Sequence, residues 1–422
     1  MSVVDAFREA AAGHQRCVWL DGGGAREWSS HRSLIGTLEP DDVSLTYSAA
    51  TGLVTRHVDG AAEVVGDDVF AVLADEMAAG SRRDQWFGYF GYACRPDLPA
   101  RPSADMPDAV WMRPSHLRLF DHSRLQDSPV TRGDVGRRGA LTTPPAYARA
   151  FERVQEHLHA GNSYEVNLTY RLAGNPGPDP VSAYLRLRAL NPAPYAGFLQ
   201  HDVPDARGWL LSSSPERYAL VTREEDDSRT IETKPIKGTT PRGSTPAEDD
   251  ALRRALQTEP KFRAENLMIT DLLRNDLGMV CDLGTVEVPA LLAVESYPSV
   301  HQLVSTVRGR LRDDVSTVAA LRALFPAGSM TGAPKLRTME IIDEVEDTPR
   351  AAYAGAFGWV SADGRADLGV VIRTLTTTDG ATYTLGTGGG VTVQSQADDE
   401  HAESRWKAER LLGALLPDGS AS

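Results

Sequence analysis

The sequence predicts an α+β fold, because strand signals dominate its first third and helix and strand signals then alternate to the end. Its 422 residues exceed the usual size of a single domain, so we expect two domains or one unusually large one. A hydrophobic content of 41% with 24% charged residues is typical of a globular protein. We therefore expect a folded chain with a sizeable core.

Residues 1–140 are predicted to form a strand-rich N-terminal region. Its strand signals are short apolar or alternating runs flanked by Gly, Asp or Pro: 17–20, 43–47 and 86–92. The third run is aromatic and contains two glycines, where another backbone could pass close. An amphipathic helix is predicted over 67–79. The polar, arginine-containing segment 127–143 marks the boundary to a second domain, 141–422.

The second domain begins with a predicted helix over 145–160. Its apolar residues recur every three or four positions from Tyr147 to Leu158, and Gly161 ends it. Further helices are predicted over 181–189, 246–256, 261–277, a segment ending at 325–326, 335–342 and 398–416. Further strands are predicted over 164–172, 195–199, 209–213, 354–360, 369–376 and 381–387.

The charge balance restricts the classes of ligand. A formal net charge of −14 argues against general nucleic-acid binding, which requires a basic surface. An anionic substrate would be repelled by the molecule as a whole, so its capture requires local cations or a metal ion.

The three cysteines, Cys17, Cys94 and Cys281, are far apart and show no paired spacing. This pattern indicates a reducing compartment without a disulfide framework. None lies in a glycine-flanked elbow that would present a thiol nucleophile. The N-terminus lacks a basic flank and an apolar core, and no apolar run approaches the roughly 20 residues of a membrane span. We therefore expect a cytoplasmic protein without a membrane partner.

An unusual lysine lies in the stretch 233–240. Lys237 follows Pro235, which restricts the backbone, and precedes Gly238, which lets a backbone approach a ligand closely. A stiff turn of this kind would point the amine at a bound molecule. The stretch alone is equally compatible with a solvated lysine in an ordinary turn.

Two features near the C-terminus could form part of a site. Glu400, Glu403 and Lys407 are spaced three and four apart, so they share one helix face, although an exposed charge ladder has the same pattern. The stretch 386–390 is rich in glycine, and consecutive backbone N–H groups can bind anions. No Lys-Ser or Lys-Thr follows, so the phosphate-binding P-loop pattern fails. A carboxylate is an equally good ligand for such N–H groups.

Seven stretches stand out between about Pro145 and Leu416: 161–168, 214–216, 235–239, 263–268, 274–278, 325–335 and 386–390. In this order they resemble the chorismate-binding domain of the chorismate-utilising enzymes, which include anthranilate synthase component I, aminodeoxychorismate synthase component I, isochorismate synthase and salicylate synthase. Within the family, Lys237 and the run 166–168 resemble the aminodeoxychorismate synthase branch. Anthranilate synthases usually have alanine at the position of Lys237.

The resemblance implies an anthranilate synthase component I-like fold, with a large core of mixed and antiparallel sheet and helices outside. It makes 141–422 the chorismate-binding catalytic domain and implies a Mg²⁺ ion ligated by Glu265 and Glu403. Hard oxygen ligands, few in number and completed by water and substrate, suit Mg²⁺. The family often has an acid three residues before Glu265. Phe262 stands there in this chain, which puts in doubt a carboxylate next to the metal ligands.

The resemblance also assigns the chemistry. Glu216 matches the general acid that protonates the departing C4 hydroxyl of chorismate, and Lys237 is expected to add at C2 and give a covalent intermediate. The implied substrate-binding residues are Arg373, Lys407, His301, Ser329, Thr331, Gly332, Gly238, Thr239, Gly388, Gly389 and Gly390. Isochorismate and salicylate members carry a water-activating lysine at the position of Glu165, so the water-adding branch is disfavoured here.

The implied activity is the conversion of chorismate and ammonia to 4-amino-4-deoxychorismate, for p-aminobenzoate and folate formation. Three alternatives stay open: an anthranilate synthase, a synthase that stops at 2-amino-2-deoxyisochorismate, and a non-catalytic chorismate-binding subunit. Ammonia is expected from a separate glutamine amidotransferase subunit, since no stretch resembles a glutaminase. Some relatives carry a regulatory tryptophan site in the N-terminal domain. It would lie near 20–22 and 28–29 here, where a packed sheet without ligand is favoured.

Overall fold

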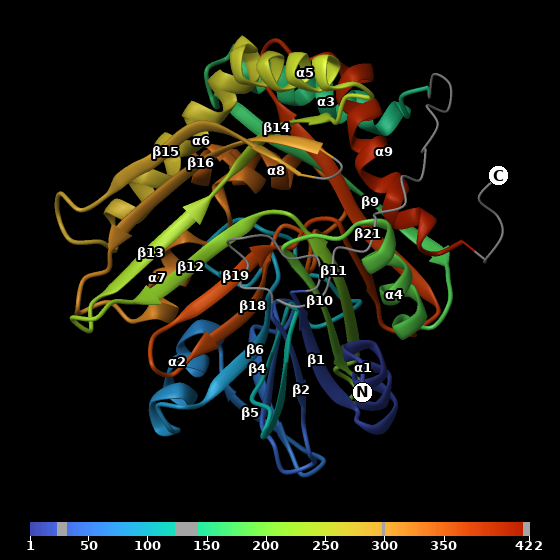
Figure 1. Ribbon diagram of the computed structural model, residues 1–422, viewed down its shortest axis with the longest axis vertical. Coiled ribbons are helices and arrows are strands. Elements are labelled where there is room, and N and C mark those ends of the chain that lie inside the picture. The colour runs from blue at the N-terminus through green and yellow to red at the C-terminus, as the bar shows by residue number, and fades with distance from the viewer. Residues whose placement is uncertain (23–31, 123–141, 298–299, 417–422) are drawn as a thin grey trace.

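Two antiparallel sheets pack against each other in the computed structural model, which describes residues 1–22, 32–122, 142–297 and 300–416 (Figure 1). Apolar side chains of both sheets, such as Leu210 from one and Tyr89 from the other, are fully buried in a shared cluster between them. The burial of such side chains is the main force that holds the sheets together. This arrangement agrees with the predicted α+β fold.

The first sheet has nine strands in the described residues. In spatial order they are β17 (Gly332–Ala333), β9 (Glu165–Pro176), β21 (Thr382–Val391), β20 (Thr374–Thr377), β11 (Gly208–Ser214), β10 (Tyr195–His201), β1 (Arg16–Asp21), β2 (Arg32–Thr37) and β8 (His116–Asp121).

The second sheet has twelve strands in the same described ranges. Their order is β14 (Ile236–Pro241), β16 (Val300–Arg310), β13 (Arg229–Lys234), β12 (Arg217–Arg223), β19 (Ala366–Val370), β18 (Ala356–Ser361), β6 (Gln85–Phe90), β7 (Ala109–Met112), β3 (Ser44–Ser48), β4 (Leu53–Val58) and β5 (Ala61–Gly66), with β15 (Glu287–Ser296) paired to β16.

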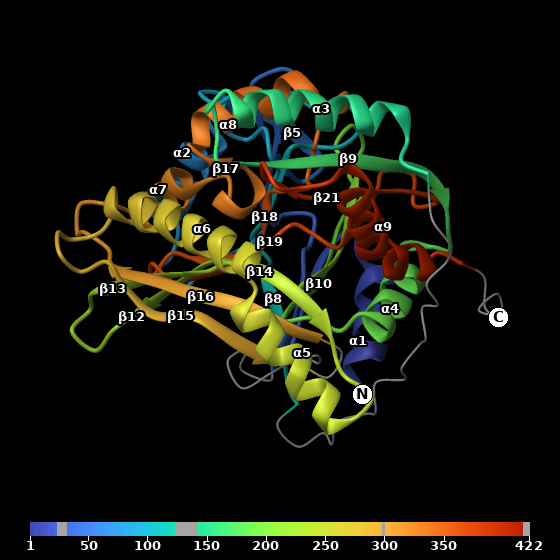
Figure 2. The ribbon, with the colours of Figure 1, turned by 90° about the horizontal axis from the view of Figure 1, so that it is seen from above.

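Helices cover the outside of the sheets, as Figure 2 shows for α3 and α8 beside β9 and for α6 beside β16. They are α1 (Val3–Gly13), α2 (Val69–Ala79), α3 (Pro145–His159), α4 (Pro180–Leu190), α5 (Pro246–Thr258), α6 (Pro260–Gly278), α7 (Thr317–Leu324), α8 (Lys335–Val345) and α9 (Ala397–Gly413). The sequence predicted all of these except α1. Several begin with proline at their first position, where its missing N–H costs no hydrogen bond.

Strands of the N-terminal region extend both sheets. β1 pairs with β10 in the first sheet, and β6, the predicted aromatic strand, pairs with β18 in the second. The two regions 1–140 and 141–422 therefore share their sheets and their core. The predicted boundary segment, 127–143, lies almost entirely outside the described residues, as do positions 28–29 of the expected tryptophan site.

The chain passes from one sheet to the other at two neighbouring places. β11 of the first sheet leads through Pro215 and Glu216 into β12 of the second, and β19 of the second leads through 371–373 into β20 of the first. The crossings are bonded to both sheets: Val370 N–H donates to Glu216 O at 3.0 Å, and Ser213 N–H donates to Arg373 O at 3.1 Å. The strand predicted over 369–376 is thus two strands, and Arg373 lies between them with a φ of +50°.

Two other local predictions also require correction. Lys237 lies in strand β14 and not in a turn, and the strand predicted over 381–387 continues through the glycine-rich stretch 386–390 as β21. Both stretches contain glycines, which lower strand propensity, but neighbouring strands supply hydrogen-bond partners on the ladder.

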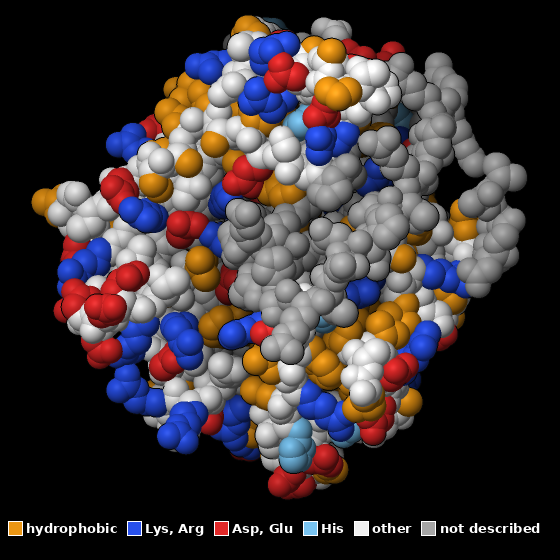
Figure 3. Space-filling view, viewed as in Figure 1, with side chains coloured by type: hydrophobic (Ala, Val, Ile, Leu, Met, Phe, Trp, Pro, Cys, Tyr) orange, Lys and Arg blue, Asp and Glu red, His pale blue; other side chains and the backbone are white. Residues whose placement is uncertain are grey.

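No described helix is long and apolar enough to cross a membrane. On the face shown in Figure 3, lysine and arginine side chains of the described residues are interspersed with acidic ones and form no continuous basic surface. This distribution is compatible with the negative formal charge of the chain.

Candidate active site

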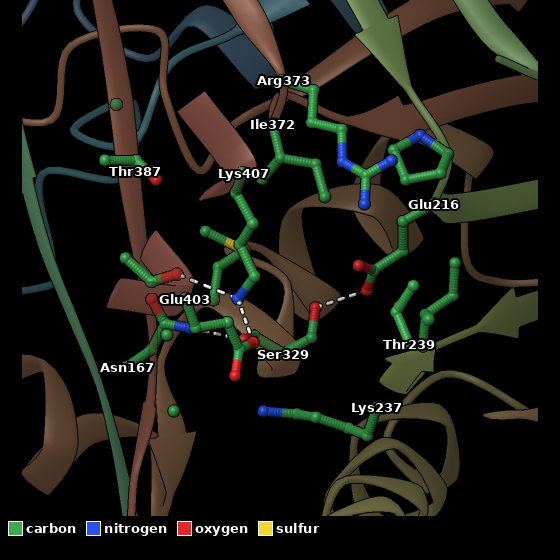
Figure 4. Close-up of a pocket in the computed structure, with 18 of the residues that line it drawn as sticks. Asn167, Glu216, Lys237, Thr239, Ser329, Ile372, Arg373, Thr387, Glu403 and Lys407 are labelled. Carbon is green, nitrogen blue, oxygen red and sulfur yellow. Dashed lines mark hydrogen bonds and ion pairs between the residues drawn. The ribbon is translucent and has the colours of Figure 1, made fainter. Parts of the chain in front are cut away.

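A pocket opens where the two sheets approach each other beside α6 and α9 (Figure 4). The second sheet contributes β14, the first contributes β21, and both chain crossings reach the pocket wall. The predicted site residues that line it are Lys237, Glu216, Glu265, Glu403, Arg373, Lys407, Ser329, Gly238, Thr239, Gly388, Gly389 and Gly390. These residues span more than 190 positions of sequence, and only the fold brings them together.

A bulge in β14 presents Lys237 to the pocket. The pairing of β14 with β16 shifts register between Ile236 and Thr239, and Gly238 within this bulge has a φ of +93°. Bulges of this kind change the direction of side chains. A Cβ at position 238 would also lie 2.9 Å from the ring of Phe262, so glycine suits this site in two respects.

Lys237 forms a buried ion pair with Glu165 of β9. The amine donates a hydrogen bond to Oε1 of Glu165, whereas Oε2 of Glu165 has no partner among the described residues. Burial lowers the pKa of Lys237, but Glu165, Glu265 and Glu216 together outweigh it, so the pKa is raised above its ordinary value. The resting amine is therefore an ammonium.

Glu216 lies at the first chain crossing and is buried. Ser329, in a short 3₁₀ helix, donates a hydrogen bond of 2.6 Å from its hydroxyl to Oε1 of Glu216, as Figure 4 shows. Burial raises the pKa of Glu216 to about 7, although Ser329, Lys237 and Arg373 oppose the shift. A carboxyl group with this pKa is suited to donate a proton near neutral pH.

The opposite wall carries carboxylates from two helices. Oε1 of Glu265, on α6, has no hydrogen-bond partner in the described structure, although the Lys261 amine lies 4.0 Å away, and burial raises the pKa of Glu265 to about 7. Glu403 of α9 forms an ion pair with Lys407 at 2.8 Å, and this lysine lowers the pKa of Glu403. Glu400, buried beside them, accepts hydrogen bonds from Lys261 at 2.8 Å and Ser395 at 2.7 Å.

This donor set fits a magnesium ion. Mg²⁺ is usually held by one or two protein carboxylates, with water and substrate oxygens completing its shell. Glu265 and Glu403 line the same pocket, and the unpartnered oxygen of Glu265 leaves a buried acceptor without a donor. No group of three or more histidine, cysteine or acidic side chains arranged for a metal occurs in the described ranges, so the protein alone would leave several positions open.

Two cations approach the pocket from the sides. Arg373 is deeply placed at the second chain crossing, and burial lowers the pKa of its guanidinium to about 10. Lys407 donates a hydrogen bond of 3.2 Å to Gly388 O of β21, so it joins α9 to that strand. Guanidinium and ammonium groups at these places could hold the carboxylates of an anionic substrate in spite of the negative formal charge.

A profile of the chorismate binding enzyme family matches residues 16–413. The chain belongs to this family. It is 42% identical over 390 residues to aminodeoxychorismate synthase of Streptomyces pristinaespiralis, with 91% of this chain and 52% of that protein covered. It is 44% identical over 318 residues to aminodeoxychorismate synthase component 1 of Escherichia coli (strain K12), with 70% of this chain and 68% of that one covered. The chain thus spans about half the length of the Streptomyces relative.

A solved structure, anthranilate synthase component I from Streptococcus pneumoniae TIGR4, has the same fold with a TM-score of 0.74. The match covers 92% of this chain and 93% of that one at 24% sequence identity. It confirms the predicted anthranilate synthase component I-like fold of this chorismate binding enzyme.

The structure does not bring three predicted substrate-binding residues to the pocket wall. Both ring nitrogens of His301, buried in β16, are engaged with Asp249 at 3.0 Å and Ser296 at 2.8 Å. Thr331 is fully buried, and its hydroxyl donates to the backbone at Gly328 O. Gly332 pairs with β9 in the short strand β17. In the described structure these three residues therefore make contacts within the protein and do not line the pocket.

Other pocket residues escaped prediction as site residues. Asn167 and Lys261 are polar residues of the pocket wall, and Glu165, which is not part of that wall, is hydrogen-bonded to Lys237, which is. Glu165 and Asn167 are two positions apart on β9, so they lie on the same face of the strand. Both fall within a stretch that resembles the family. Lys261 stands one turn before Glu265 on α6, which is a spacing that the sequence shows.

Proposed function

We propose that this chorismate binding enzyme converts chorismate and ammonia to 4-amino-4-deoxychorismate. The observation that carries the proposal is the amine of Lys237, buried in the pocket together with Glu216, whose pKa burial raises to about 7. The names of the Streptomyces and Escherichia coli relatives support the same activity. A nucleophile and an acid in one pocket suit a displacement at an allylic alcohol.

The chain's own residues supply two displacements. Glu216 gives its proton to the C4 hydroxyl oxygen, which leaves as water. The amine of Lys237, once its resting ammonium has given up a proton, bonds to C2 and the ring double bonds shift. Ammonia then bonds to C4, the double bonds shift back, and the bond between C2 and the lysine nitrogen breaks. Arg373 and Lys407 would hold the substrate carboxylates so that C2 stays near Lys237.

Glu265 and Glu403 would hold Mg²⁺. When bound, the ion would neutralise a substrate carboxylate and favour departure of the hydroxyl.

The cytoplasmic location expected from the sequence remains a prediction.

A product assay tests the activity. Purified protein with chorismate, MgCl₂ and ammonium chloride should form 4-amino-4-deoxychorismate, identified by chromatography and mass spectrometry. Anthranilate with pyruvate would show an anthranilate synthase, and accumulation of 2-amino-2-deoxyisochorismate would show an incomplete C2 aminase. No turnover with retained chorismate binding would show a non-catalytic subunit.

Magnesium binding is tested with Glu403→Gln. Loss of one charged ligand should weaken Mg²⁺ binding by at least about 100-fold, because even indirect partners of metal ligands contribute 10–100-fold. Titration calorimetry of Mg²⁺ into the protein measures this without turnover. Glu409→Gln, on the same helix but outside the pocket wall, is the matched control. Equal Mg²⁺ affinity in both variants would rule out Glu403 as a ligand.

We further propose that a separate glutamine amidotransferase provides the ammonia. All three cysteines are buried, and burial raises the pKa of Cys17 to about 12, of Cys281 to about 11 and of Cys94 well above its ordinary value. Such thiols are poor nucleophiles for glutamine. The isolated chain should therefore use ammonium salts but not glutamine, and an added glutaminase subunit should confer glutamine use. Glutamine-dependent turnover by the chain alone, without contaminating glutaminase, would contradict this.

A further inference from the structure

The ion pair between Glu165 and Lys237 connects the two sheets. Glu165 comes from β9 of the first sheet and Lys237 from β14, an edge strand of the second. Only 1% of the Glu165 side chain and 8% of the Lys237 side chain is exposed. Moving two charges out of water is costly even when they pair with each other. Because such costly groups cluster at functional sites, this pair beside the pocket is a candidate for a chemical role.

The backbone of Glu165 is held firmly. β9 pairs with β17 on one side, where Ala333 faces Glu165, and with β21 on the other. The hydroxyl of Ser163 donates a hydrogen bond of 2.8 Å to Glu165 O. The carboxylate therefore starts from a rigid strand, which keeps its position relative to Lys237.

A glycine of β21 makes room for the pair. A Cβ at Gly390 would overlap Oε1 of Glu165 and lie 3.1 Å from Nζ of Lys237. The backbone of β21 is thus in direct contact with both charged groups. Any larger side chain here would have to displace the carboxylate or the amine.

Other acidic groups near Lys237 have different partners or tasks. Glu216 accepts a hydrogen bond from Ser329 and is the proposed acid for the leaving hydroxyl. Glu265, on α6, is a proposed magnesium ligand and lies beyond ion-pair distance of Lys237. Farther along the pocket wall, the cations are Lys261, Lys407 and Arg373, and the acids are Glu400 and Glu403. Among the described residues, Glu165 alone is hydrogen-bonded to the amine of Lys237.

We propose that Glu165 accepts a proton from the Lys237 ammonium and returns it at the end of the cycle. The inference rests on the proposed function. In the first step a proton moves from Nζ to Glu165, which leaves a neutral amine and a carboxylic acid. The lone pair of the amine then forms the bond to C2. When ammonia has displaced the lysine, the carboxylic acid gives the proton back to the departing amine, so protons and charges balance over the cycle.

The test compares turnover of wild type, Glu165→Gln and Glu165→Asp. Glutamine keeps the shape and a hydrogen-bonding oxygen but cannot take the proton, so turnover should fall at least about 100-fold, the lower range for loss of a general base. Aspartate keeps a carboxylate that can pair with the lysine and take its proton, and should retain at least about a tenth of wild-type turnover. Circular dichroism confirms folding of each variant. An aspartate variant as inactive as Lys237→Ala would overturn the proposal, whether or not the glutamine variant folds.

The pH dependence separates proton transfer from a merely structural loss. Without Glu165 the lysine must lose its proton to solvent, so the ratio of variant to wild-type turnover should rise about tenfold per pH unit below the pKa of the lysine. The requirement for protonated Glu216 is common to both proteins and cancels in the ratio. A ratio that is constant with pH would overturn the proposal.

Asp276→Asn is the matched control, because Asp276 also forms a buried ion pair with a lysine, Lys335, but outside the pocket wall. Its turnover ratio to wild type should stay constant with pH. A wild-type protein that makes no 4-amino-4-deoxychorismate would defeat the proposed function and this inference with it. Product formation by wild type, with Glu165→Gln equally fast, would defeat this inference alone.

Discussion

Two buried lysine–carboxylate pairs in this molecule have different surroundings. Lys335 donates hydrogen bonds of 2.7 Å both to Asp276 and to the backbone oxygen of Leu324, and burial lowers its pKa. Lys237 has one hydrogen bond among the described residues, to Glu165, and its pKa is raised because carboxylates outweigh burial. Oε2 of Glu165 has no partner in the same part of the chain.

The difference indicates what each pair is suited to do. Lys335 is held by two acceptors between α6, α7 and α8, where a fixed geometry stabilises the packing of the helices. Lys237 has fewer partners and faces an open pocket, so its amine can leave the carboxylate for another bonding partner. Less complete hydrogen bonding, and not burial alone, is therefore what supports the proposal that Lys237 is reactive and Lys335 structural.

The largest effect on activity is expected from Lys237→Ala. Formation of 4-amino-4-deoxychorismate should fall by at least about 1,000-fold, since removal of a covalent nucleophile costs orders of magnitude. Some C2-aminated product should remain, because ammonia can attack where the lysine would have bonded. Product ratios from mass spectrometry measure both. Unchanged formation of the C4 product would exclude the nucleophile role. Lys237 would then have no catalytic task that distinguishes it from Lys335.

A smaller effect is expected from Glu216, the proposed acid, which lines the same pocket as Lys237. Its pKa of about 7 means that the protonated form predominates below pH 7 and is lost as the pH rises, so wild-type turnover should decline above pH 7. Glu216→Gln should lower turnover about 100-fold and remove this decline. The pH profile of kcat for both proteins is the measurement. A variant that keeps the alkaline decline would assign it to another group.

Gly390→Ala tests whether the contact between Glu165 and Lys237 matters for turnover, without removing a charge. The added methyl group would press on Glu165 and Lys237 and lengthen their hydrogen bond. Turnover should fall about tenfold, the size expected when reacting groups are misplaced by less than an ångström. Gly388→Ala is a poor control because its Cβ would meet the backbone of β9. Gly413→Ala at the end of α9 is used instead, because its Cβ would make only an ordinary contact of 3.8 Å with Leu190. Equal activity of the two variants would show that Gly390 is not needed for the pair.

The smallest effect on activity is expected from Asp276→Asn. It removes the charge partner of Lys335, so the free energy of unfolding should fall by about 3–5 kcal/mol, as for other broken buried pairs. Turnover at a temperature where the variant is folded should stay within about twofold of wild type. Denaturant unfolding and kcat measure the two quantities. A large loss of turnover in the folded variant would show that this pair also takes part in the chemistry.

The helices were the most predictable part of the fold. α3 was predicted within one residue, since its apolar face repeats at helical spacing and proline and glycine mark its ends. The strand predicted over 369–376 failed at Arg373, because a continuous run of β-forming residues does not reveal that its two halves belong to different sheets. The helix α1 was missed, since its alanine-rich sequence was taken with the strand-rich region around it.

The sequence by itself identified the family and singled out the proposed acid, the proposed nucleophilic lysine and the two proposed metal ligands, because each lies in a short stretch that resembles the family. Only the tertiary structure decided how they meet. Glu165 and Lys237 are 72 residues apart and belong to different sheets, so no local pattern shows that they are bonded. His301 matched the family but does not line the pocket, and its ring is bonded to Asp249 and Ser296. Contacts between sheets depend on the register of distant strands, and register arises from the packing of the whole core.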